Sequence, residues 1–130
     1  MGESLDHYEY TELLKKLVVK IDNISQIIKP ETLAARLKEI ETIEQDPDFW
    51  NDAKNAADIQ KEKNKAASIL EKYRKAKAAV EDTKDLYEMA NDEGDEETLK
   101  DLLHDAPSLE ATISALEVSM MLSGENDGNN

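Results

Sequence analysis

The side chains of this 130-residue chain that could do chemistry are mainly carboxylates and two histidines, since cysteine is absent. His104 lies near Asp101 and Asp105, an arrangement from which a metal or acid–base site could be imagined. No second histidine or cysteine lies within reach on the same helix, and His7 is the only other histidine, so a solvated histidine is favoured. The sequence also lacks a phosphate-binding glycine loop and a nucleophile motif. We expect no catalytic residue, metal site or cofactor, and therefore no enzyme activity of this chain alone.

Basic side chains offer a second kind of site. Nine of the sixteen Lys and Arg residues lie between residues 51 and 90, although the net charge of the chain is −14. Overall attraction to nucleic acid or an anionic membrane should therefore be weak. If RNA is contacted, the candidate residues are Lys61, Lys65, Lys72 and Lys75. Carboxylates are interleaved with these lysines, so a solvated or ion-paired face is favoured over specific RNA reading.

Two aromatic residues stand together inside the acidic stretch "EQDPDFWNDAKN". Phe49 and Trp50 are the only phenylalanine and the only tryptophan of the chain. At a junction between helices, both rings would fold over the end of the bundle and plug it, because helix side chains thin out there. The alternative is a contact site for a partner, which tryptophan also favours. We expect the structural plug.

The elements that must position these residues are long helices. Apolar residues recur at spacings of three and four through most of the chain, and glycine and proline are few. The pattern predicts helices over about 5–29, 31–45, 51–91 and 95–122. Pro30 predicts a break or a kink of the first helical region, with a break slightly favoured. Pro107 should bend the last helix without dividing it, and residues 123–130 read as a disordered tail or a truncated linker.

These stripes predict an all-α fold, because each apolar seam must be covered by another. We expect an elongated antiparallel three-helix bundle or coiled coil over residues 1–122, with the first helix split at Pro30. A helix of about forty residues would extend roughly 60 Å, which suits a rod. The absence of cysteine fits a reducing compartment, and no apolar run is long enough to span a membrane. A cytoplasmic protein is expected.

The chain further resembles the N-terminal helical domain of bacterial peptide chain release factors, of the release factor 2 type. The resemblance covers about residues 31–128, and residues 1–30 match more loosely. Release factor 1 lacks both the Phe-Trp turn and the Ser-Gly-Glu exit. The residues that carry the resemblance are Asp46, Pro47, Phe49, Trp50 and Asn51 at the turn, Gln60 to Glu62, Asp95 to Thr98, and Leu122 to Glu125.

The resemblance implies a role in stop-codon-dependent translation termination. It implies contact with the ribosome at the stalk base of the large subunit, including its L11 protein, and with release factor 3. The Ser-Pro-Phe and Gly-Gly-Gln motifs that such factors use for codon recognition and hydrolysis are absent from this sequence. The chain is therefore interpreted as a positioning arm. The alternative is a free-standing coiled-coil adaptor or scaffold, in which the stripes would pair between chains.

Overall fold

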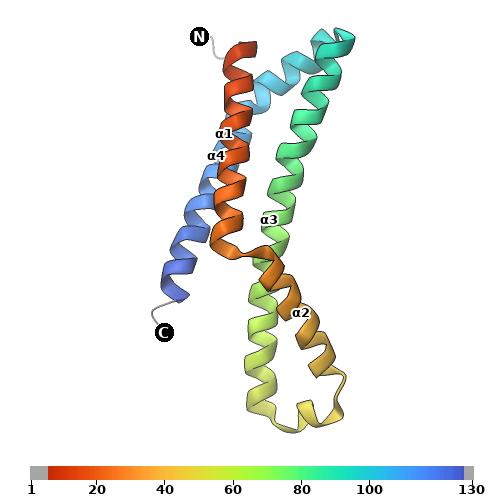
Figure 1. Cartoon of the computed structure of the whole chain (residues 1–130), viewed down its shortest axis with the longest axis vertical. Helices are drawn as coiled ribbons and strands as arrows, with labels where there is room; N and C mark the ends of the chain where they lie inside the picture. Colours follow the sequence, from red (N-terminus) through yellow and green to blue (C-terminus); the bar gives the residue numbers. More distant parts are fainter. Residues whose placement is uncertain (1–5, 128–130) are drawn as a thin grey trace.

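The computed structural model describes residues 6–127, and the side chains of residues 6–122. The described part is helical and contains no strand, which confirms the all-α prediction. Figure 1 shows an elongated molecule in which a narrow arm extends from a thicker region of three helices. The elements are α1 His7–Ile28, α2 Pro30–Glu44, the short 3-10 helix η1 Pro47–Asn51, α3 Ala53–Glu93 and α4 Glu96–Asp127.

The first helical region is divided into two helices. Asp6 and Glu9 form a capping box at the start of α1, and α1 ends at Ile28. Lys29 follows in the left-handed conformation, with φ of 52° and ψ of 71°, and Pro30 begins α2. Because proline cannot donate to the preceding turn but suits the first turn of a helix, one residue is enough to end α1 and start α2. The favoured break at Pro30 is confirmed.

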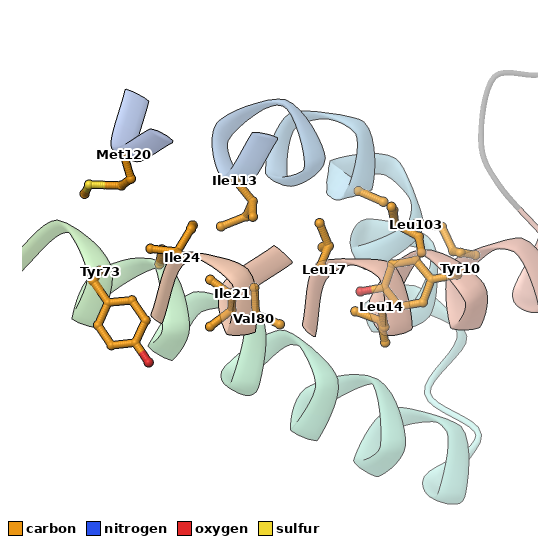
Figure 2. Packing of buried hydrophobic residues seen from close by; sticks show 13 residues of the cluster. Tyr10, Leu14, Leu17, Ile21, Ile24, Tyr73, Val80, Leu103, Ile113 and Met120 are labelled. Atoms are coloured by element: carbon orange, nitrogen blue, oxygen red, sulfur yellow. The ribbon is translucent and has the colours of Figure 1, made fainter. Parts of the chain in front are cut away.

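The thicker region consists of α1, α4 and the second half of α3. In Figure 1, α1 and α4 run in the same direction and α3 runs in the opposite direction. Figure 2 shows the apolar side chains of α1 lying between those of α4 and α3. The buried cluster is formed by Tyr10, Leu13, Leu14, Leu17, Ile21, Ile24, Tyr73, Ala76, Val80, Leu103, Ala106, Ile113 and Met120. The apolar stripes read from the sequence therefore meet in one core.

The arm is a helical hairpin made by α2, η1 and the first half of α3. After the break at Lys29, α2 leaves α1 and packs against α3 and η1. Its smaller core contains Ile40, Phe49, Ala56, Ala66 and Leu70, all of them buried. The region expected to run as one bundle is thus two packed parts in series, and the continuous helix α3 belongs to both.

The final helix departs from the expected boundaries at its end. Gly94 takes the left-handed conformation that ends α3, with φ of 68°, and Asp95 accepts a hydrogen bond from the Thr98 amide at 3.1 Å. Pro107 lies inside α4, which changes direction along its course but is not interrupted. The helix continues to Asp127, beyond the end expected at residue 122, and the disordered tail or truncated linker expected from residue 123 stays a prediction. Polar residues and one glycine weaken a helix without ending it. Residues 128–130 lie outside the described part.

Candidate functional site

The tip of the arm is built by two aspartate caps. Asp46 accepts a hydrogen bond from the amide of Asp48 at 2.9 Å, and Pro47 is the first residue of η1. Asp52 accepts from the amide of Asn55 at 3.1 Å and starts α3. These carboxylates satisfy amides that would otherwise lack partners at the helix starts. The sequence thereby fixes the backbone that carries the aromatic pair.

The two aromatic side chains of the tip take different positions. Phe49 is 7% exposed, whereas Trp50 is 53% exposed. Their rings meet edge to face, with centroids 4.7 Å apart and an interplanar angle of 82°. The indole Nε1 of Trp50 donates to the backbone carbonyl of Glu44 at 3.1 Å. The expectation that both rings would be buried was therefore wrong for Trp50, whose ring is held in place but remains open to solvent.

A polar cluster around Glu44, the residue whose carbonyl binds the indole of Trp50, joins α2 to α3. The carboxylate of Glu44 accepts from Lys63 Nζ at 3.0 and 3.1 Å and from the side-chain amide of Gln60. The hydrogen bond from Gln60, and then that from Lys63, lowers the pKa of Glu44 below its ordinary value. Glu44 therefore stays ionised at neutral pH, and its backbone carbonyl holds the indole. These positioning residues were not singled out from the sequence, in which Glu44 and Lys63 are nineteen residues apart.

A second polar contact joins the two helices nearer the break. Arg36 donates to both carboxylate oxygens of Glu62, at 2.7 and 2.8 Å, and also to Glu39 at 2.8 Å. This two-point pairing raises the pKa of Arg36 and lowers that of Glu62 through hydrogen bonding. Such geometry orients more than it stabilises, because the Glu39 and Glu62 side chains remain 64% and 43% exposed. Together with the cluster at Glu44, it fixes the direction in which the arm presents its tip.

The four candidate lysines lie on one exposed side of α3. Lys61, Lys65, Lys72 and Lys75 are separated by four, seven and three residues, spacings that return to the same helix face. Lys75 pairs with Glu71 at 3.5 Å on the same helix. The structure therefore groups these lysines in an exposed row, away from the buried side chains of α3. Their role in RNA contact stays a prediction.

The histidines lie in different surroundings. His7 Nδ1 and the hydroxyl of Tyr87 are 3.1 Å apart, which links the start of α1 to α3. His104 is exposed on α4. Within the part of the chain that the structure describes, no group of three or more histidine or carboxylate side chains could hold a metal ion. No helix within residues 6–127 combines the length and the apolar character needed to cross a membrane.

The described residues thus form a helical rod whose arm ends in an exposed tryptophan, held by the backbone carbonyl of Glu44. Residues 33–130 match the PCRF domain, and the chain belongs to this family. It is 58% identical over 126 residues to peptide chain release factor 2 of a Nitratiruptor species. It is 55% identical over 126 residues to the protein of the same name from Campylobacter concisus. Both alignments cover 97% of this chain and 34% of the relative.

The chain thus spans about one third of the length of the curated relatives it matches, 34% of each. The matched portion is the N-terminal region of release factor 2, a translation termination factor. This confirms the resemblance that rested on the Phe-Trp turn and the other short motifs. It also disfavours the free-standing adaptor or scaffold.

Proposed function

We propose that the chain acts in translation termination as the non-catalytic positioning arm of a release factor, in the cytoplasm. Its partners are the ribosome, at the large-subunit stalk base with its L11 protein, and release factor 3. The observation that carries this proposal is the 58% identity to release factor 2 over almost the whole chain. The arm adds a physical reason, because a rigid hairpin with an anchored tip can hold a contact away from the body of a protein.

The tip suits a basic protein surface. Trp50 offers an exposed ring whose position is fixed by its contacts with Phe49 and Glu44. The carboxylates of Asp46, Asp48 and Asp52 surround it in the sequence. A lysine or arginine of the partner can stack on the indole while these carboxylates attract it. Repulsion from phosphates makes the same tip a poor contact for bare RNA.

The proposal is tested by binding of the fluorescently labelled chain to purified bacterial large ribosomal subunits. We expect saturable binding that full-length release factor 2 displaces. Trp50→Ala should weaken this binding about tenfold or more, since tryptophans buried at an interface often dominate its energy. The matched control is Tyr8→Ala, because Tyr8 is an exposed aromatic at the start of α1. Figure 1 shows the start of α1 and the tip of the arm at opposite ends of the molecule. Circular dichroism checks that both variants remain helical.

The contact partner is separated by two further measurements. Binding is compared for isolated stalk-base RNA and for the stalk-base protein, over a range of salt concentrations. Tight binding to the RNA alone at moderate ionic strength would contradict the protein contact and would direct attention to Lys61, Lys65, Lys72 and Lys75. The absence of displaceable binding to large subunits would refute the proposal as a whole.

A further inference from the structure

The middle of α3 is strongly basic. Residues 61–77 contain seven lysine or arginine residues and two glutamates, a net charge of +5 in a chain whose net charge is −14. Residues 46–58, at the tip of the arm, contain four aspartates and one lysine, and residues 81–97 contain nine carboxylates and one lysine. Figure 1 places these two acidic stretches at opposite ends of α3. The helix therefore has a basic middle between two acidic ends.

The basic middle of α3 presents four lysines on one side. We call Lys61, Lys65, Lys72 and Lys75, all of them exposed, the lysine row. The fourteen residues from Lys61 to Lys75 rise about 21 Å along the helix. Within residues 6–122, neither Lys61 nor Lys72 forms an ion pair. The row thus includes cations that the protein itself does not neutralise.

The two carboxylates that lie within the lysine row in the sequence do not cancel its charge. Arg36 of α2 donates to both oxygens of Glu62, at 2.7 and 2.8 Å, and so neutralises this carboxylate with a cation from outside the row. Glu71 pairs with Lys75 at 3.5 Å, with side chains that are 67% and 76% exposed. So exposed a pair is weak and exchanges readily for another partner. The interleaved carboxylates, which favoured a neutral ion-paired face in the sequence, therefore leave a positive surface in the structure.

The surface around the lysine row lacks the side chains that dominate protein interfaces. No large apolar side chain is exposed between residues 53 and 85 of α3, and the two exposed ones of this helix, Leu86 and Met89, lie beyond that stretch. Protein partners draw most of their binding energy from buried aromatic and apolar anchors. Lysines bind the phosphates of nucleic acids without such anchors. The row therefore suits phosphates better than a protein surface.

We propose that the lysine row binds the phosphate backbone of RNA through charge alone, with the middle of α3 lying along the RNA. Phosphates repel the two acidic ends of α3, which confines the contact to the row and keeps the tip free for a protein. The choice of RNA as the source of the phosphates rests on the proposed function, since a termination factor acts at the ribosome. The row itself is a surface separate from the tip.

The contact is weak and depends strongly on salt. Each phosphate that a lysine neutralises adds about 0.9 to the slope of the logarithm of affinity against the logarithm of salt concentration. Three to four contacts therefore predict about a thousandfold loss of affinity between roughly 0.02 and 0.2 M salt. Binding to RNA alone is thus measurable at low salt and is not tight at moderate ionic strength.

The test measures fluorescence anisotropy of a short labelled RNA duplex of arbitrary sequence over this range of salt. The double variant Lys61→Gln with Lys72→Gln should lower the affinity at low salt at least tenfold and reduce the salt slope by about two. The matched control is Lys84→Gln with Lys100→Gln. These lysines are also exposed and their loss changes the net charge equally, but they lie outside the row. The control should retain the salt slope of the unmodified chain.

A gain-of-binding variant guards against a loss caused by unfolding. Glu71→Gln removes the carboxylate that pairs with Lys75 and should strengthen binding to the duplex severalfold at low salt. Glu88→Gln, which removes an exposed carboxylate of α3 outside the row, should have a smaller effect. Equal gains for the two variants would mean that only the net charge matters, and would contradict a local site.

The proposal is overturned if the unmodified chain does not bind the RNA duplex at low salt, or if the two double lysine variants weaken binding equally. Tighter binding to a DNA duplex of the same sequence would contradict the assignment to RNA. Tighter binding to a polyglutamate peptide would replace RNA with an acidic protein. The result is separate from that of the proposed function, because Trp50→Ala should weaken binding to large subunits and leave binding to the duplex unchanged.

Discussion

Tyr10 is the most deeply buried aromatic side chain among residues 6–122, with 1% of its surface exposed. Its ring packs against Tyr87 with centroids 4.8 Å apart, yet its hydroxyl oxygen has no hydrogen-bond partner within the same residues. Burial, and then the charges of Tyr87 and Asp105, raises the pKa of Tyr10 to about 12. The core therefore holds the neutral phenol and disfavours the phenolate.

The variant Tyr10→Phe removes the hydroxyl and keeps the ring, and so distinguishes their contributions to stability. At neutral pH we expect the free energy of unfolding to stay the same or rise by up to about 1 kcal/mol, because an unpaired buried hydroxyl is removed. In the unmodified chain, the folded-state pKa lies above the ordinary value of 10.0. The contribution of Tyr10 is thus complete below that value and is lost as pH rises toward about 12. Urea unfolding across this pH range should show that the free energy of unfolding falls less with rising pH for Tyr10→Phe than for the unmodified chain.

The control for this comparison is Tyr8→Phe, because Tyr8 is exposed on α1. With that change, the free energy of unfolding should fall with rising pH as much as it does for the unmodified chain. If Tyr10→Phe destabilises the protein by several kcal/mol, its hydroxyl has a partner and the argument fails.

Residue-scale detail at the tip was predictable only in part. The capping aspartates and Pro47 were readable from the sequence, since they act on their own neighbours. Which of two adjacent aromatic rings turns inward depends on the direction of η1 relative to α2, and this direction follows from contacts with α3. The anchoring of Trp50 by Glu44, Gln60 and Lys63 depends on the same pairing of α2 with α3.

At the scale of elements, the helix ends at Lys29 and Gly94 use the same backbone conformation with different residues. Both have positive φ, 52° for Lys29 and 68° for Gly94. For an ordinary residue this conformation costs roughly 1–2 kcal/mol, whereas glycine adopts it freely. The helices expected over about 51–91 and 95–122 leave Gly94 between them, where it ends α3. At Lys29 the sequence revealed only the effect of Pro30, so the break was foreseen but the direction in which α2 leaves α1 was not.

The variant Gly94→Ala tests the hairpin end. A methyl group at this position would meet no heavy atom within 4 Å. The expected loss, about 1 kcal/mol in the free energy of unfolding, therefore comes from the backbone alone. Thermal or urea unfolding measures it. The opposite exchange, Lys29→Gly, should not destabilise the chain to this extent because it relieves the same strain. An unchanged stability for Gly94→Ala would show that the turn adopts another conformation.

At the scale of the whole molecule, the repulsion caused by the high net charge opposes the packing of the helices. The chain carries −14 at neutral pH and has a pI near 4.5. The exposed cross-helix ion pair of Lys16 with Glu110 contributes little, and the more buried pair of Lys20 with Glu117 is screened less by salt. Self-repulsion should therefore outweigh them in the response to salt.

Raising the ionic strength from about 0.01 to 0.1 M shortens the screening length from about 30 to 10 Å. At neutral pH we expect the melting temperature to rise by a few degrees, because the repulsion among the excess carboxylates is screened. Scanning calorimetry measures this change. Near the pI the same salt addition should have little effect, which serves as the control. A fall in melting temperature with salt at neutral pH would mean that the ion pairs dominate.

The all-α class and the extent of most helices were predictable because apolar residues recur at spacings of three and four wherever a helix has a buried face. The division into a thicker region and an arm was not, since it depends on where α2 goes after one residue.

The continuous helix α3, shared by the arm and the thicker region, has a consequence for how the molecule opens. If α2 detaches, the first half of α3 loses the helix that packs against it in the arm (Figure 1), and most of the stability of a helix in a protein comes from such packing. The arm should thus melt as one cooperative unit, together with its half of α3, while the remainder stays folded. Amide hydrogen exchange would then divide α3 into two parts. The amides of its first half would exchange faster, and those of the half that packs against α1 and α4 would exchange more slowly.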